Sequence, residues 1–269
     1  MNTNLFLHEL RRNTFSLILW GIIITVLISV TMSVYPAFME NQSKVMGMLS
    51  LIPKGALQFK GISNFNDLLS ASGFYAVNNV IYMLVLGSIF AIVLASNILL
   101  KEEYNKTAEY LLTRPLTRKE IFFSKSSVVL LNVFFLNLVT ALAGFISIAL
   151  VKTGAFSLRS FMILSLYTFL LNILFGSIGL FLSVIVKRAR PITTFCIGLV
   201  LILYFIYTLS KITESIAKIG YLSPFKYVNL EVTSPTYKLN LLSLSYFIGL
   251  SLLFYLLSYR LYLRRDIYT

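Results

Sequence analysis

The side chains that could do chemistry are concentrated in one charged stretch, residues 101–125, which reads KEEYNKTAEYLLTRPLTRKEIFFSK. Outside it the candidates stand alone, since His8 is the only histidine and Cys196 is the only cysteine. A nucleophile with its base, or a set of metal ligands, needs several such side chains close together. A phosphate-binding loop, GxxxxGK followed by Ser or Thr, does not occur in the sequence. We therefore expect no catalytic residue, no metal site and no cofactor in this chain, and we do not expect an enzyme.

The charged stretch itself predicts two helices joined by an elbow. Apolar side chains recur there at i, i+4, i+7 and i+8, the spacing of one helical face, and these are Tyr104, Ala108, Leu111 and Leu112. Pro115 ends this helix because it lacks an N–H group and disfavours the helical conformation of the preceding residue. Thr117 and Glu120 have the spacing of a capping box, which starts a second helix at once. We call residues 101–126 the elbow.

Composition indicates that the remaining chain lies in a membrane. The sequence is 58% hydrophobic and 12% charged, with a mean hydropathy of +0.83. Its charged share is about half of the ~25% that is usual in soluble domains. The 23 Lys and Arg residues outnumber the 10 Asp and Glu residues, and they lie between apolar runs. Basic residues in such places set topology and bind anionic headgroups, so the partner predicted here is a lipid bilayer and not a nucleic acid.

Six apolar runs are long enough to cross a bilayer of ~30 Å. They cover about residues 15–35, 76–100, 128–151, 161–186, 192–209 and 241–259. The sequence thus predicts an all-α membrane protein, with residues 1–269 forming a single transmembrane domain. Lys and Arg are more numerous on the side that holds both termini and the elbow. By the positive-inside rule, both termini and the elbow are cytoplasmic and the protein lies in the cell membrane.

Short helices are expected outside the six runs. Leu7 and Leu10 beside Phe6 predict an amphipathic helix on the inner surface before the first run. Ser223 as N-cap with Pro224 at the first helical position predicts another short helix before the sixth run, on the membrane surface or dipping into it.

The ends of the runs also carry tyrosines. These tyrosines, at or near the ends of the runs, are Tyr35, Tyr75, Tyr259 and Tyr262. We interpret these side chains as interfacial residues at the level of the headgroups.

The apolar runs contain no Asp, Glu, Lys or Arg. Ion-coupled carriers and voltage sensors normally need such groups inside the membrane, so both classes are disfavoured. The polar residues that remain include four asparagines, namely Asn97, Asn132, Asn137 and Asn172. They either hydrogen-bond between helices or line a translocation pathway.

The elbow resembles the cytoplasmic signature of type-2 ABC exporter permeases. The resemblance rests on Glu102-Glu103 and on residues 106–118, KTAEYLLTRPLTR. Tyr35-Pro36 after the first run, residues 73–75 (GFY) before the second and residues 222–227 (LSPFKY) before the sixth agree with it, so it covers essentially the whole chain. Many members of that family carry Gly where this chain has Lys106, and we interpret the lysine as the mark of a subgroup.

The resemblance implies specific roles. The N-terminal amphipathic segment would be an interface helix, and the elbow would include a coupling helix that contacts an ATP-binding subunit. The implied contact residues are Glu102, Glu103, Tyr104, Thr107, Ala108, Glu109, Leu111, Leu112, Arg114, Pro115 and Arg118. A re-entrant extracytoplasmic helix would form an exit gate with Pro224, Phe225 and Tyr227.

The resemblance also implies an assembly of two permease chains, as a homodimer or a heterodimer, with two ATP-binding subunits that bind ATP and Mg²⁺. Alternating access would then export a substrate such as an amphipathic peptide, a lipid-like molecule or a drug. The alternative is a non-transporting scaffold or sensor that binds a cytoplasmic partner through the elbow. The basic side chains Arg114, Arg118 and Lys119 either meet acidic residues of the ATPase or face anionic lipid.

Overall fold

The computed structural model describes residues 2–52, 68–104, 117–151, 156–186, 189–212, 214–230, 232 and 237–264. All regular elements in these ranges are helical. The six long helices are α1 (Thr3–Ser33), α5 (Ala71–Tyr104), α7 (Arg118–Val151), α8 (Leu158–Ile185), α9 (Ala189–Ile212) and α10 (Leu241–Arg264). The short ones are α2 (Tyr35–Glu40), α3 (Gln42–Ser50) and the 3₁₀ helices η2 (Glu214–Leu222) and η3 (Pro224–Tyr227). The predicted all-α class with six long apolar helices is confirmed.

Most of the long helices extend beyond the apolar runs that predicted them. The clearest case is α1, which begins at Thr3 and runs without a break to Ser33. Asn2 caps its start, since its side-chain Oδ1 accepts a hydrogen bond from the Leu5 N–H at 3.1 Å. The amphipathic segment that we expected before the first run is therefore the first part of α1 and not a separate helix. No proline or glycine lies between Thr3 and Trp20 to interrupt it.

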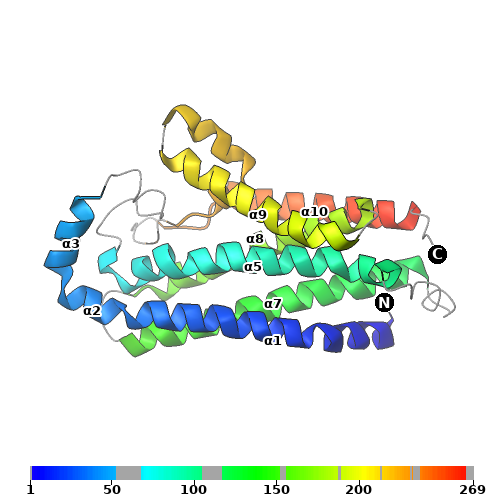
Figure 1. Cartoon of the computed structure of the whole chain (residues 1–269), viewed down its shortest axis with the longest axis horizontal. Helices are drawn as coiled ribbons and strands as arrows, with labels where there is room; N and C mark the ends of the chain where they lie inside the picture. Colours follow the sequence, from blue (N-terminus) through cyan, green and yellow to red (C-terminus); the bar gives the residue numbers. More distant parts are fainter. Residues whose placement is uncertain are drawn as a thin grey trace.

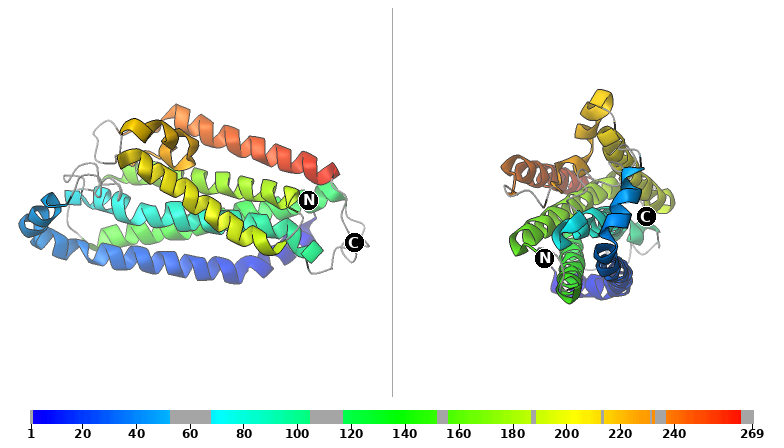
Figure 2. Two further views of the ribbon diagram at one scale, coloured as in Figure 1. Left: turned by 45° about the horizontal axis from the view of Figure 1, so that its top comes forward. Right: turned by 90° about the vertical axis from the view of Figure 1, so that its left-hand side faces the viewer.

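The bundle is built around α5 and α8, which are the most buried of the long helices. Helix α1 packs against α7 and α5, α9 packs against α5, and α10 packs against α8. Figures 1 and 2 show this order, with α1 and α7 on one side of α5 and with α9 and α10 on the other. In the apolar stretches of the outer helices α1, α9 and α10, less than a third of the residues are buried.

Small residues allow α5 and α8 to approach closely. Gly87, Ala91 and Ala95 are spaced four residues apart on α5, and Ala91 and Ala95 are fully buried. A Cβ atom on Gly179 of α8 would lie 2.5 Å from the carbonyl oxygen of Ile92 and 2.8 Å from the Cβ of Ala95. In lipid, helices associate through such close van der Waals contact because no hydrophobic effect drives them together.

The start of α1 and the end of α10 lie at the same end of the bundle, beside the two helix ends that flank the elbow (Figure 1). The Asn2 N–H donates to the Ser124 hydroxyl of α7 at 3.0 Å. Arg118, at the start of α7, donates from Nη1 to the carbonyl oxygen of Leu263 near the end of α10 at 3.4 Å. We call this end of the bundle the elbow end.

The interpretation of Tyr35 and Tyr75 as interfacial residues is wrong. Both side chains are buried inside the bundle at the end opposite the elbow. The Tyr35 hydroxyl donates to the carbonyl oxygen of Leu69 at 2.9 Å, and the Tyr75 ring packs over Gly144, where any Cβ atom would overlap it. A buried tyrosine needs a partner for its hydroxyl, and for Tyr35 the backbone supplies one.

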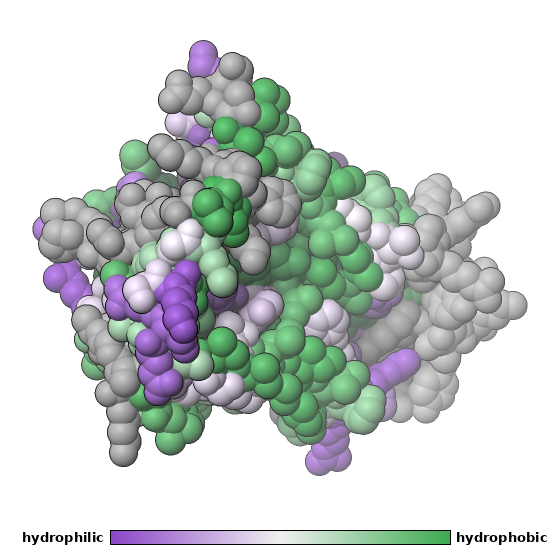
Figure 3. All heavy atoms as spheres, turned by 60° about the vertical axis from the view of Figure 1, so that its left-hand side comes forward, coloured by the Kyte–Doolittle hydropathy of each residue, from purple (hydrophilic) through white to green (hydrophobic). Residues whose placement is uncertain are grey.

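The outer surface is apolar along the bundle, as Figure 3 shows for one face. Large hydrophobic side chains are exposed on α1, α7, α9 and α10, among them Phe15, Phe134, Phe205 and Leu252. Exposed apolar surface of this extent promotes aggregation in water, whereas lipid tails can cover it. Together with the six apolar helices, they indicate a multi-pass membrane protein.

Candidate functional site

Most of the predicted contact set of the elbow lies outside the described residues. This holds for Thr107, Ala108, Glu109, Leu111, Leu112, Arg114 and Pro115. The backbone of Glu102, Glu103 and Tyr104 forms the last turn of α5. Arg118 is the one member of the set with a described side chain, and it joins α7 to α10.

The capping box predicted at the start of α7 is present. One carboxylate oxygen of Glu120 accepts from the Thr117 N–H and from the Thr117 hydroxyl, both at 2.9 Å. The Thr117 hydroxyl oxygen in turn accepts from the Glu120 N–H at 3.2 Å. The hydrogen bonds from Thr117 lower the pKa of the Glu120 carboxyl group, which lies ahead of the apolar part of α7. The second helix of the elbow therefore has a fixed starting point.

Aromatic side chains fasten this start of α7 to α10. The fully buried Phe122 ring lies 5.5 Å from the rings of Tyr255 and Tyr259 and 5.6 Å from that of Tyr262. Tilted aromatic pairs at such distances add to the gain from burial. We call Phe122 and these three tyrosines the aromatic cluster.

Lys125 is a buried lysine whose burial the sequence analysis did not predict. Its side chain is 1% exposed, and its ammonium group donates to the carbonyl oxygen of Ile98 at 2.7 Å. Ile98 belongs to α5, before the elbow, whereas Lys125 lies at the far end of the elbow, on α7. The signal was present in the spacing, because Lys125 lies four residues after Ile121 and four before Val129, and both are buried. Lys125 thus ties together the two helices that the elbow connects.

Three of the four predicted asparagines hydrogen-bond between helices. Asn172 of α8 accepts from the Ser88 hydroxyl of α5 at 3.2 Å and donates to Asn137 of α7 at 3.3 Å. These three residues are buried near the middle of their helices. Asn97 of α5 donates to the Thr193 hydroxyl of α9 at 3.1 Å.

Asn132 differs from these three. Its amide donates to the Val128 carbonyl of its own helix, and its Oδ1 has no hydrogen-bond partner in the described part of the chain. The geometry establishes the interhelical role for Asn97, Asn137 and Asn172. Their role in a pathway stays a prediction.

The predicted helix start before the last span is present as η3. Ser223 is its N-cap and Pro224 occupies its first turn. The Ser223 hydroxyl also donates to the Leu203 carbonyl of α9 at 2.7 Å. This bond fastens the start of η3 to α9.

Two aromatic side chains of η3 reach further helices. The fully buried Phe225 ring packs against Phe175 of α8 and Tyr204 of α9, each at 5.4 Å. Tyr227 stacks on Tyr246 of α10 at 3.7 Å. Pro224, Phe225 and Tyr227 therefore lie where three spans meet, and their role as a gate stays a prediction.

Metal-binding chemistry has no candidate here, since no three His, Cys, Asp or Glu side chains are grouped among the described residues.

Comparison with known proteins gives one assignment. A family model described as ABC-2 family transporter protein matches residues 3–267. The chain belongs to the ABC-2 transporter family. A comparison with curated proteins gave no match.

Membership of the ABC-2 family confirms the resemblance to type-2 ABC permeases. The match to the family model covers nearly the whole chain. An ABC-2 family chain with six apolar helices is a multi-pass membrane protein. Membership also implies that the chain associates with an ATP-binding subunit.

Proposed function

We propose that this ABC-2 family chain is the permease subunit of an ATP-driven exporter. A separate polypeptide would bind ATP and Mg²⁺ and hydrolyse ATP, and this chain would have no catalytic activity of its own. The observation that carries the proposal is the anchoring of the elbow, whose sequence resembles the family signature. The Lys125–Ile98 hydrogen bond joins α5 to α7, the two helices that the elbow connects. Close to this bond, α7 is also hydrogen-bonded to Asn2 at the start of α1 and to α10.

This anchoring supports a mechanical role. If an ATPase pushed on the elbow, α5 and α7 would move together, because the Lys125–Ile98 bond is buried and short. The motion of α5 would carry α8 with it, since Gly179 lets their backbones meet. Helix α8 contacts Phe225 through Phe175, near the middle of α8. A displacement at the elbow would thus reach the proposed gate, which is the requirement for alternating access.

The proposed assembly has two permease chains, identical or different, and two ATP-binding subunits. Both termini and the elbow are cytoplasmic in this arrangement, and η3 is extracytoplasmic and re-entrant. The proposed substrates are amphipathic molecules such as peptides, lipid-like molecules or drugs. They suit spans that carry amides, hydroxyls and aromatic rings but no charges in their apolar cores.

Co-expression with candidate ATP-binding subunits tests the proposal. The true partner should co-purify with the wild-type chain, and a Leu111→Ala/Leu112→Ala variant should lose it. The Leu253→Ala variant, changed on the exposed face of α10, should keep it. A complex whose ATPase activity responds to no substrate would favour the scaffold or sensor instead.

A further inference from the structure

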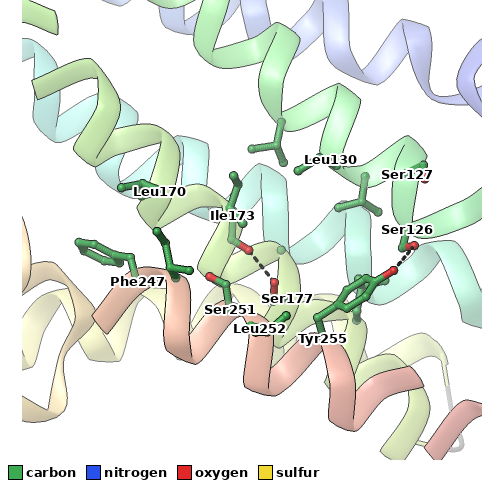
Figure 4. Close-up of a pocket in the computed structure, with 15 residues that line it drawn as sticks. Ser126, Ser127, Leu130, Leu170, Ile173, Ser177, Phe247, Ser251, Leu252 and Tyr255 are labelled. Atoms are coloured by element: carbon green, nitrogen blue, oxygen red, sulfur yellow. Dashed lines mark hydrogen bonds between the residues drawn. The ribbon is translucent and has the colours of Figure 1, made fainter. Parts of the chain in front are cut away.

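A cavity of about 350 Å³ lies between α7, α8 and α10 (Figure 4). The aromatic cluster joins α7 to α10 on its elbow side. Next to the cluster, the hydroxyl groups of Ser126 and Tyr255 lie 3.3 Å apart and form one end of the cavity. Beyond this pair α7 and α10 separate, and α8 forms the back wall (Figure 4).

The cavity lining is mostly apolar. It includes Val129 and Val133 of α7, Leu170, Ile173 and Leu180 of α8, and Phe247 of α10. Leu130, Ile248 and Leu252 line it as well and are about half exposed on the outer surface of the bundle. The cavity therefore opens sideways. In a bilayer the medium at this opening is lipid tails and not water.

The end of the cavity nearest the elbow lies within the leaflet on that side. Ser126 lies about 12 Å along α7 from Arg118, because an α-helix rises ~1.5 Å per residue. Half of the hydrocarbon layer is ~15 Å thick. A lipid whose headgroup lies near Arg118 can therefore place a tail beside the cavity.

At the level of the headgroups, the surface formed by α7 and α10 is basic. Arg118 bridges α7 to α10, and Lys119 and Arg260 are exposed on these two helices. Basic side chains at this level attract anionic headgroups. The apolar cavity therefore suits the acyl chain of an anionic phospholipid, and the basic side chains next to it suit the headgroup.

We propose that this cavity binds one acyl chain of an anionic phospholipid from the leaflet at the elbow end. An unfilled cavity would leave its lining without van der Waals partners on one side, and a tail supplies them. The hydroxyls of Ser126 and Tyr255 already bond to each other, so the tail leaves neither unsatisfied. The proposal requires only that the chain spans a membrane and does not depend on export.

The test uses the full chain, with its partner where one co-purifies, in nanodiscs of phosphatidylcholine and phosphatidylglycerol. A phosphatidylglycerol with a photoreactive diazirine on one acyl chain is cross-linked, and the labelled peptides are mapped by mass spectrometry. The label should concentrate on residues 126–133, 170–180 and 247–255. Ser251→Trp fills the cavity and should lower this label about tenfold, as expected when about two methylene groups of the tail are excluded from it. Leu253→Trp, at an exposed position outside the lining, should leave it unchanged.

Ser177→Leu fills the same cavity from α8 and serves if Ser251→Trp fails to insert. Label spread evenly over the exposed apolar faces of the wild-type chain would overturn the proposal, as would equal label in the Ser251 and Leu253 variants. Equal label from a phosphatidylcholine probe would overturn the assignment to an anionic lipid. Label from an alkyl detergent probe, without label from the phospholipid, would overturn the assignment to lipid altogether.

Discussion

The ammonium group of Lys125 lies 2.7 Å from the carbonyl oxygen of Ile98, so a side chain at the end of the elbow bonds to the helix before it. The lysine is almost fully buried. Hydrogen bonds from charged donors contribute about 1.5–3 kcal/mol. The two helices that the elbow connects are therefore joined by a strong contact within the protein.

Lys125→Met tests this contact, because methionine keeps the length of the side chain but cannot donate. We expect the free energy of unfolding, measured by SDS titration, to fall by about 1.5–3 kcal/mol. Substrate-stimulated ATPase activity of the complex should fall further than stability explains, whereas Lys125→Arg should restore part of it. Lys44→Met removes an exposed lysine from α3, at the end of the bundle opposite the elbow, and is the control. Equal activity in the Lys125→Met and Lys44→Met variants would rule out the mechanical role.

Gly179→Ala tests the close contact of α5 and α8. The new Cβ would meet the backbone carbonyl of Ile92, which cannot move without displacing α5. Overpacking of this kind costs about 1–3 kcal/mol, and we expect a correspondingly lower melting temperature. Gly198→Ala on α9 is the matched control, since its Cβ would meet nothing within 4 Å. A Gly179→Ala variant as stable as Gly198→Ala would show that the two helices are further apart.

Asn172→Leu separates the two roles of the buried amides. It removes the bonds to Ser88 and Asn137, and we expect about 1 kcal/mol less stability in SDS titration, given that interhelical hydrogen bonds in membranes average ~0.6 kcal/mol. Asn78→Leu is the control, because that amide bonds to Phe74 of its own helix. Unchanged stability with altered substrate preference would instead assign Asn172 to the pathway.

Phe225→Ala tests the attachment of η3. Its ring is enclosed by Phe175, Tyr204 and Tyr207, and removing a buried Phe costs about 3–5 kcal/mol. We expect faster amide hydrogen exchange throughout residues 214–230, with α5 and α8 unaffected. Leu222→Ala, at a side chain that is 72% exposed, should leave the exchange rates unchanged. Exchange confined to residue 225 itself would contradict the packing described here.

Local signals in the sequence predicted much of this fold. Hydropathy located the six spans, and the capping box of Thr117 with Glu120 and the Ser223-Pro224 start both lie where they were expected. These features depend on residues a few positions apart, which a sequence shows directly.

Features that depend on contacts between distant segments were harder to predict. Tyr35 at the end of a span has the pattern of an interfacial residue, but its partner Leu69 is far along the chain. The burial of Lys125 follows from its place on the packed face of α7, where its charge suggested exposure. The continuity of α1 was missed because hydropathy reports the membrane-crossing part of a helix and not its full length.

The most direct test of the central claim is ATP-driven transport by the reconstituted complex with its ATP-binding subunit. The wild-type complex should export a substrate that stimulates its ATPase activity, and the chain alone should hydrolyse no ATP. Replacing Glu102, Glu109 or the Leu111-Leu112 pair by alanine should abolish transport while membrane insertion stays normal. Transport at the wild-type rate after disruption of the whole elbow would contradict the account.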